Sequence, residues 1–103
     1  MASDSFVHLH VHSEHSMLDG AARIKPLMEA VAQEGQPAIA MTDHGNTFGA
    51  FEFASAAQAQ GVKPIIGCEV YVAPGSRLEK KSSGGGGRDV YNHLVLLAKD
   101  EVG

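Results

Sequence analysis

Residues 6–13 read Phe-Val-His-Leu-His-Val-His-Ser, and three histidines alternate with apolar side chains along this segment. In a β-strand successive side chains point to opposite faces, so His8, His10 and His12 would line one face. Neutral imidazoles on a rigid strand suit a Zn²⁺- or Mn²⁺-like cation, whereas burying them without partners is costly. The alternation also fits a plain surface strand, so the rest of the sequence has to separate these two interpretations.

The composition restricts the classes of protein to which this chain can belong. It has 103 residues, 44% of them hydrophobic, and no apolar run long enough to span a bilayer. We therefore expect at most one globular domain and no membrane contact. The net charge of −4 argues against an autonomous nucleic-acid-binding protein. Cys68 has no second cysteine to pair with, and residues 1–5 lack signal-peptide features, which favours a reducing, cytoplasmic location.

The spacing of apolar residues predicts strands that alternate with helices. A helix is expected from Ile24 to just before Gly35, and a second over residues 47–60 with Gly61 as its stop. Extended segments are expected at residues 6–13, 37–42, 63–73 and 93–98. Apolar runs without alternation indicate strands covered on both faces, as in a parallel sheet. The predicted fold class is therefore α/β, built from βαβ units.

The composition changes to Gly, Ser and Lys after Pro74, and apolar residues return in the expected strand at residues 93–98. We expect a flexible surface loop at about residues 78–90, whether native or inserted. The chain stops where another helix would follow, and two helices cannot cover four strands. An uncovered apolar face is therefore expected, which implies either a longer parent protein or self-association of this piece.

Side chains that can bind a metal follow several of the predicted strands. The first strand ends in His10 and His12 and its loop carries Asp19, while His44 and Glu69 belong to the next two strands. In parallel α/β folds the functional groups gather at the carboxyl ends of the strands. Three strands would therefore deliver metal-binding residues to one edge of the sheet, which favours ligation over the surface-strand interpretation.

Five other residues have weaker claims on this site. His93 begins its apolar run instead of ending it, which places it at the wrong end for that edge. His8 is expected to support the ligating histidines without binding the metal. Asp43 would either orient an imidazole or form a turn or cap. Cys68 fits a small buried apolar residue, and His15 fits a solvated or substrate-facing one.

These motifs also carry a family resemblance. The strings SMLDG at residues 16–20 and TDHGN at 42–46, in order with HVH, GCE at 67–69 and NHL at 92–94, resemble the polymerase and histidinol phosphatase (PHP) domain family. The resemblance covers nearly the whole chain outside residues 78–90. Within the family it is greatest with the form found at the amino terminus of bacterial replicative DNA polymerases.

The resemblance implies a distorted (β/α)₇ barrel, of which residues 1–103 would be the N-terminal portion. It also implies up to three Zn²⁺ or Mn²⁺ ions in the full domain and fewer in this chain. By their positions in the family motifs, the metal ligands in this span are His10, His12, Asp19, His44, Glu69 and His93. The remaining ligands of the family have no counterpart before residue 103.

The activity that the resemblance implies is metal-dependent phosphoester hydrolysis, in the form of a 3′–5′ exonuclease that removes misincorporated nucleotides. The parent enzyme would be a DNA polymerase, a nucleotidyltransferase that synthesises DNA during replication. A metal-bound water is the expected nucleophile, because metals supply the positive charge that an acidic chain lacks. The implied partners are DNA, through the parent polymerase, and a separate proofreading exonuclease or other replisome subunits.

Two other functions remain open at this point. The domain could be a non-catalytic module that stabilises the polymerase and docks a proofreading exonuclease. It could also be a free-standing phosphoesterase, or a metal hydrolase of the amidohydrolase type, although Asp19 and the TDHGN string argue against this third class. We expect residues 1–103 alone to be weakly active or inactive, because at least one metal would lack ligands.

Overall fold

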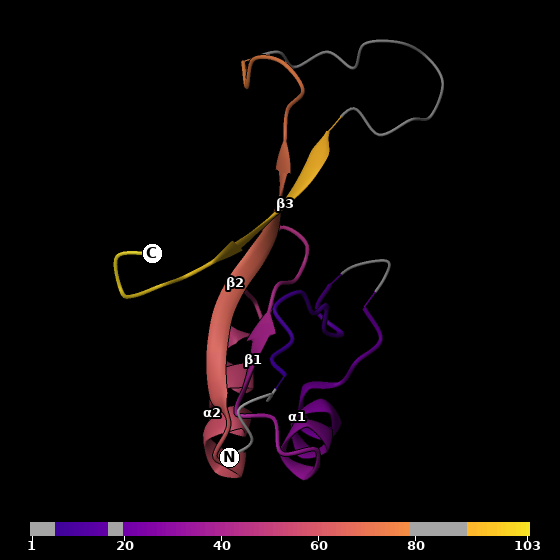
Figure 1. The fold of residues 1–103 in the computed structure, drawn as a ribbon. Helices are drawn as coiled ribbons and strands as arrows, with labels where there is room; N and C mark the ends of the chain where they lie inside the picture. Colours follow the sequence, from indigo (N-terminus) through magenta and orange to yellow (C-terminus); the bar gives the residue numbers. More distant parts are fainter. Residues whose placement is uncertain (1–5, 17–19, 79–90) are drawn as a thin grey trace.

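The computed structural model of the chain describes residues 6–16, 20–78 and 91–103. Its elements are, in order, α1 (Ile24–Gln33), β1 (Ala38–Met41), α2 (Ala50–Gln60), β2 (Lys63–Val72) and β3 (Asn92–Leu97). The strands form one sheet in the order β1-β2-β3. Both helices lie at one end of β2, and the ribbon of β2 and β3 extends away from them (Figure 1). The predicted α/β class is confirmed.

The parallel pair that the sequence predicts is formed by β1 and β2. All four residues of β1 are buried, and Ala38 pairs with Lys63 while Met41 pairs with Ile66. Helix α2 connects the two strands, which is the crossover that a parallel pair requires. The missing alternation in β1 therefore did indicate a strand covered on both faces.

The hydrophobic core lies between the two helices and β1. Its buried members are Ile24, Met28, Val31, Ile39, Met41, Phe53, Ala57 and Val62. On α1 the buried residues recur at helical spacing, so one stripe of this helix faces the rest of the core. Each large side chain that leaves water here stabilises the fold by about 1.5–3 kcal/mol.

Both helices end where the sequence predicts, but α2 begins later than predicted. Helix α2 ends at Gly61, which has a φ of 71°, and Gly35 follows α1 with a φ of 72°. These are left-handed conformations that glycine adopts without a steric penalty. Helix α2 begins at Ala50 and not at Thr47, because a turn in which the Ala50 amide donates to the Thr47 carbonyl (3.1 Å) precedes it.

The segment of residues 6–13 is not a regular strand, and that prediction is wrong. The segment lies parallel to β1, with one isolated bridge between His8 and Ile39. The His8 carbonyl accepts from the Ala40 amide (2.9 Å), and the Val11 carbonyl accepts from the Thr42 amide (2.8 Å). These acceptors are three residues apart whereas the donors are two apart, so one extra residue interrupts the ladder, as in a bulge.

Strand β3 differs from its prediction in direction and in burial. It pairs antiparallel with β2, with His93 opposite Tyr71 and Leu97 opposite Gly67, so the parallel direction assumed when His93 was placed at the wrong end of its strand does not hold. Its side chains are exposed except for Val95, which is half-buried, so the expectation of a buried strand is also wrong. An apolar run without alternation does not reveal whether another layer covers it. The expected uncovered apolar face is therefore present on this ribbon.

Gly67 lies where β2 approaches its neighbours most closely. A Cβ atom at this position would lie 2.4 Å from the Leu96 carbonyl oxygen and 3.1 Å from the Thr42 methyl carbon. No side chain fits there without a backbone shift. Glycine, which lacks a Cβ atom, permits this close approach.

Two predicted features lie outside the described residues. These are Asp19 and residues 79–90, which make up nearly all of the expected Gly-rich loop. Within the described part of the chain, neither helix has the length and apolar character needed to cross a membrane.

Phe53 and Phe51 offer a matched test of the core. Phe53 is fully buried whereas Phe51 is 86% exposed, although both belong to α2. We expect Phe53→Ala to lower the free energy of unfolding by about 3–5 kcal/mol, because it removes apolar contacts and leaves a cavity. Phe51→Ala should change it by less than about 0.5 kcal/mol. Urea denaturation followed by circular dichroism measures both, and equal midpoints would show that this core is wrongly assigned.

Candidate metal centre

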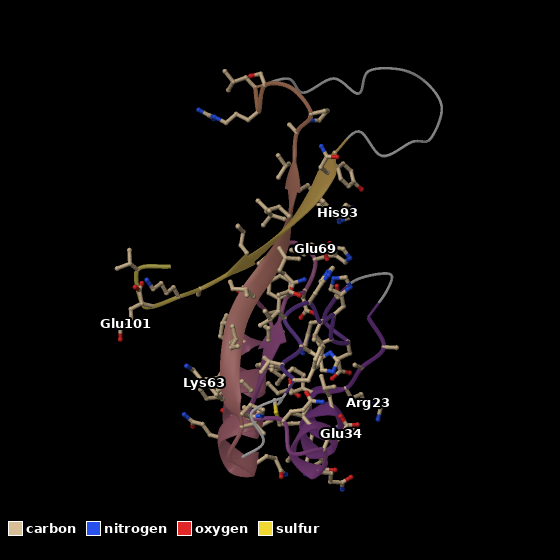
Figure 2. The ribbon with its side chains drawn as sticks, in the orientation of Figure 1. Arg23, Glu34, Lys63, Glu69, His93 and Glu101 are labelled. Atoms are coloured by element: carbon tan, nitrogen blue, oxygen red, sulfur yellow. The ribbon has the colours of Figure 1, made fainter. Side chains whose placement is uncertain are left out.

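Glu69 of β2 is the centre of the candidate site. Its side chain is only 5% exposed. Four imidazole rings converge on its carboxylate from three other parts of the chain. Figure 2 shows Glu69 on β2 close to His93 on β3. The rings belong to His10, His12, His44 and His93.

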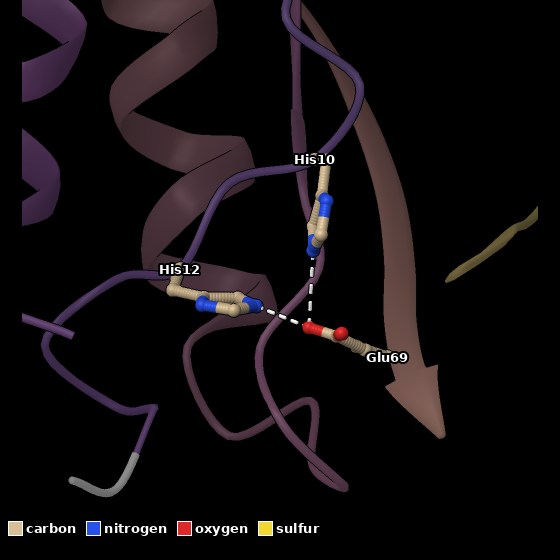
Figure 3. Close-up of side chains that lie close together, drawn as sticks. All are labelled: His10, His12 and Glu69. Atoms are coloured by element: carbon tan, nitrogen blue, oxygen red, sulfur yellow. Dashed lines mark hydrogen bonds and ion pairs between the residues drawn. The ribbon is translucent and has the colours of Figure 1, made fainter. Parts of the chain in front are cut away.

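Both oxygens of this carboxylate face imidazole nitrogens. His10 Nε2 lies 3.1 Å from Oε2, His12 Nε2 contacts the same oxygen, and Figure 3 shows this pair of contacts. His44 Nδ1 lies 3.5 Å from Oε2. His93 Nδ1 lies 3.1 Å from the other oxygen, Oε1. The carboxylate therefore joins rings on its two sides.

These contacts divide into two groups of donors that could each hold a metal ion. One comprises His10, His12 and Glu69, and the other His44, Glu69 and His93. Within each group the donor atoms lie within 4.8 Å of one another. The two groups share Glu69, so ions bound in both would be neighbours.

The backbone around His44 and Glu69 fixes these two side chains next to each other. The two residues form an isolated parallel bridge beyond the end of β1. In it the Gly45 amide donates to the Glu69 carbonyl (2.9 Å), and the Glu69 amide donates to the Asp43 carbonyl (3.0 Å). The loop after β1 is thereby held against the middle of β2.

The antiparallel direction of β3 explains why His93 reaches the site. His93 is opposite Tyr71 and Val95 is opposite Glu69, so His93 is the diagonal neighbour of Glu69 on the same face. The sequence suggested that His93 lies at the wrong end of its strand. That conclusion assumed a parallel strand, and the reversed direction brings the beginning of β3 to the carboxylate.

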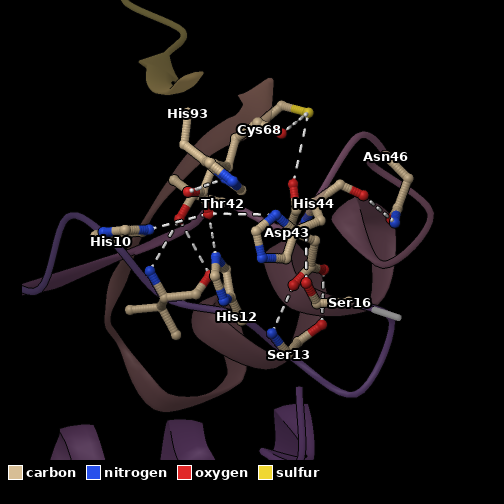
Figure 4. A network of polar contacts seen from close by, with 12 residues as sticks. His10, His12, Ser13, Ser16, Thr42, Asp43, His44, Asn46, Cys68 and His93 are labelled. Carbon is tan, nitrogen blue, oxygen red and sulfur yellow. Dashed lines mark hydrogen bonds and ion pairs between the residues drawn. The ribbon is translucent and has the colours of Figure 1, made fainter. Parts of the chain in front are cut away.

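A second layer of buried polar side chains holds the histidine segment in place. Asp43 is fully buried and accepts hydrogen bonds from the Ser13 amide (2.5 Å) and the Ser13 hydroxyl (2.7 Å), as Figure 4 shows. Thr42 Oγ1 accepts from the Val11 amide (2.9 Å). The His44 amide donates to Ser16 Oγ (3.0 Å).

These hydrogen bonds give Asp43 a definite position in the site. It acts through the backbone next to His12, and this is compatible with the supporting role that the sequence suggested for it. Sequence reasoning missed Ser13, Ser16 and Thr42, each of which is at most 1% exposed. Polar residues directly beside predicted ligands are a signal that could have indicated them, because buried polar groups need partners.

The histidines also control the charge of Glu69. Burial by itself raises the pKa of this carboxyl, because a dry surrounding penalises the charged form. Hydrogen bonds from His10 and His12, and the charges of His44 and His10, act in the opposite direction and lower the pKa from 4.5 to about 2. Glu69 is therefore an anion at neutral pH, which is the form that binds a cation.

Three other predicted residues have different outcomes. His8 lies outside both donor groups, and its ring packs edge-on against Phe6 with a centroid distance of 4.7 Å. The structure therefore does not bring His8 to the carboxylate. Asp19 lies outside the described residues, so its role as a ligand stays a prediction. Cys68 is half-buried and not fully buried as the sequence suggested, its Sγ lies 3.6 Å from the Asp43 carbonyl oxygen, and it belongs to none of the donor groups among the described residues.

His15 lies in a separate cluster and is 33% exposed, so the solvated or substrate-facing position expected for it stays a prediction. Its Nε2 lies 3.3 Å from Glu52 Oε2, and its ring rests on Gly49, where a Cβ atom would come within 2.6 Å of a ring carbon. Glu14, His15 and Glu52 form a third group that could hold a metal ion. Both of its carboxylates are exposed, so it lacks the burial that distinguishes the Glu69 centre.

The chain resembles known proteins over nearly its full length. A family model described as PHP domain matches residues 8–103. Relatives named DNA polymerase III subunit alpha include one from Thermus aquaticus, 54% identical over 102 residues that cover 95% of this chain and 8% of the relative. Another, from Treponema pallidum (strain Nichols), is 52% identical over 103 residues that cover 100% of this chain and 9% of the relative.

A third relative of the same name comes from Mycobacterium tuberculosis (strain ATCC 25618 / H37Rv). It is 48% identical over 112 residues, which cover 99% of this chain and 10% of the relative. The chain thus spans at most 10% of the length of these three relatives.

Asp43→Ala tests the hydrogen bonds behind the histidines. The change leaves the Ser13 amide without its buried acceptor, so we expect the free energy of unfolding to fall by about 1–3 kcal/mol. Zn²⁺ affinity should fall about 10- to 100-fold, because the residue next to His12 loses its anchor. Urea denaturation and calorimetric titration with Zn²⁺ measure the two effects. Asp100→Ala, at an exposed position, is the control, and unchanged Zn²⁺ affinity in folded Asp43→Ala would contradict the role given to Asp43.

Proposed function

This chain belongs to the PHP domain family, and on that premise we propose that it is the PHP segment of a bacterial DNA polymerase III subunit alpha whose Glu69 centre binds metal for phosphoester hydrolysis. The observation that carries the proposal is the convergence of four imidazoles on one buried carboxylate. Imidazoles and a carboxylate brought together at one point are the donor types that bind Zn²⁺ and related cations in proteins.

The donor atoms favour Zn²⁺ or Mn²⁺. Imidazole nitrogens suit these borderline cations, whereas Ca²⁺ prefers a shell of oxygens. The proposed ligands are His10, His12, Asp19, His44, Glu69 and His93. Asp19 rests on the family motif alone, while the other five are supported by their positions around the carboxylate. A bound cation would polarise the phosphoester and neutralise the charge that develops on the leaving oxygen.

The side chains of this chain would provide the remaining parts of the site. Glu69 is anionic, and the bonds of Asp43 and Thr42 to residues 11–13 keep the histidine segment rigid. The imidazoles of His10 and His93 are 56% and 41% exposed, so a phosphate could reach the site from solvent on that side. Because the chain has a net charge of −4, the bound cations would supply most of the attraction for the phosphate.

Wider features of the whole protein belong to the same proposal. Residues 6–13, β1 and β2 lie parallel and adjacent, which suits the first strands of a (β/α)₇ barrel. The polymerase activity, the contact with DNA and other replisome subunits, and a cytoplasmic location would belong to the longer protein. Proofreading by 3′–5′ hydrolysis is the reaction proposed for this segment. The preserved set of donors favours it over a module that only docks a separate exonuclease.

Glu69→Gln and Glu52→Gln make a matched pair for metal binding. Glu69→Gln removes the carboxylate that both donor groups of the proposed centre share. Glu52→Gln makes the same change to one exposed carboxylate of the cluster of Glu14, His15 and Glu52. We expect Glu69→Gln to reduce Zn²⁺ affinity by more than about 100-fold, beyond the usual effect of a supporting residue. Glu52→Gln should leave this binding unchanged. Elemental analysis of protein purified without chelator and calorimetric titration measure the outcome, and less than one metal per wild-type chain would refute ligation.

Hydrolysis is best tested in a full-length polymerase subunit that carries this segment. We expect Mn²⁺-dependent removal of a mismatched 3′-terminal nucleotide, reduced by more than about 100-fold in His12→Ala, since ligand loss removes several kcal/mol of electrostatic stabilisation. Product release from a labelled primer measures the rate, with Glu52→Gln as the control. A subunit that binds metal but removes no nucleotide would favour the non-catalytic module instead.

A further inference from the structure

Two tyrosines continue the face of the ribbon that carries the proposed metal centre. Tyr71 follows Glu69 by two residues on β2, and Tyr91 precedes His93 by two residues, just before β3 begins. Side chains two apart on a strand share a face, so Tyr71 lies on the same side of the ribbon as Glu69. The ring contacts of Tyr91 with Tyr71 and His93 place it on that side too. Tyr71 is also directly opposite His93 in the antiparallel register.

The two tyrosines form an aromatic cluster with the histidines of the centre. The ring centroids of Tyr71 and Tyr91 are 4.1 Å apart, and that of His93 lies 5.1 Å from Tyr71 and 5.6 Å from Tyr91. The ring of His44 is nearly parallel to that of Tyr71 at 6.3 Å. An aromatic surface thus borders two proposed ligands.

This surface remains open to solvent. Tyr71 is 52% exposed and Tyr91 is half-buried. Such large exposed aromatic side chains beside a polar site are typical of binding surfaces, because a ring loses little conformational entropy when it contacts a ligand. About half of the Tyr71 surface is therefore open to a ligand that reaches the centre.

We propose that Tyr71 and Tyr91 form a stacking site for the base of the nucleotide whose phosphate is held at the Glu69 centre. Two residues along a strand span about 6.7 Å, so Tyr71 lies one such step beyond Glu69, and Tyr91 lies further out, beyond the pair of Tyr71 and His93. Nucleotides carry their base at a comparable offset from the phosphate. Stacking on aromatic rings accepts every base, which suits an enzyme that must remove any terminal nucleotide.

The proposal rests on the proposed function and specifies its substrate as an unpaired terminal nucleotide. It differs from a purely structural role, in which the tyrosines would only orient His93. Orientation of His93 would affect metal binding and all phosphate ligands alike, whereas stacking affects only ligands that contain a base. The two roles are therefore separable by comparing ligands with and without a base.

The composition of the chain provides a direct signal for this test. It contains two tyrosines and no tryptophan, so its tyrosine ring resonances come from Tyr71 and Tyr91 alone. The Zn²⁺-loaded chain is titrated with thymidine 5′-monophosphate and, separately, with 2-deoxyribose 5-phosphate, while proton NMR follows these rings. We expect the nucleotide to shift the tyrosine signals upfield and to bind about 5- to 150-fold more tightly than the sugar phosphate.

Variants at position 71 test whether the Tyr71 ring causes the preference for the nucleotide over the sugar phosphate. Tyr71→Phe should keep the preference for the nucleotide, because it keeps the π-face, and Tyr71→Leu should abolish it without changing the affinity for 2-deoxyribose 5-phosphate or Zn²⁺. Phe51→Leu, which alters an exposed aromatic residue on α2, is the control and should keep the preference.

Three results would overturn the proposal. The first is equal affinity of the wild-type chain for the two ligands, and the second is an undiminished preference in Tyr71→Leu. The third is an equal loss of affinity for both ligands in Tyr71→Leu, which would show that the Tyr71 ring only orients His93. If neither ligand binds the metal-loaded wild-type chain, the proposed function fails and the stacking site fails with it.

Discussion

The structure depends on one buried carboxylate and the imidazoles around it. An ionised acid that is 5% exposed would destabilise a small domain strongly without partners. Glu69 has them, and its pKa falls to about 2 although burial alone would raise it. The partners come from residues 6–13, from the loop after β1 and from β3. The same contacts that lower this pKa therefore tie four separate segments of the chain together.

The polar layer behind the histidines shows how the apolar core and the candidate site depend on each other. Asp43 and Thr42 directly follow β1, whose residues are all buried, and they are themselves fully buried. Buried carboxyl and hydroxyl groups need hydrogen-bond partners, and residues 11–13 provide them. Packing of β1 against the helices therefore determines where His12 lies. Loss of core packing would loosen the candidate metal centre before any proposed ligand is changed.

Local patterns predicted most elements, and the failures have two physical causes. Helix α1, strand β1, the end of α2 and the extent of β2 follow from apolar spacing and from glycine stops, which act within a few residues. The regular strand at residues 6–13 failed because one extra residue interrupts its ladder with β1, which alternation alone does not reveal. The direction and the burial of β3 were predicted wrongly, because an apolar run contains no information about which neighbour it pairs with or what covers it.

The sequence by itself determined the α/β class, the family resemblance and the residue types of the proposed metal site, because motifs such as HVH and TDHGN place chemically suitable side chains next to strand ends. Only the tertiary structure decided that four histidines share Glu69 and that His93 joins them through an antiparallel strand. Only the tertiary structure, too, placed Tyr71 and Tyr91 beside the site. The physical reason is that strand direction, register and diagonal contacts arise between segments far apart in the chain, where no local spacing constrains them.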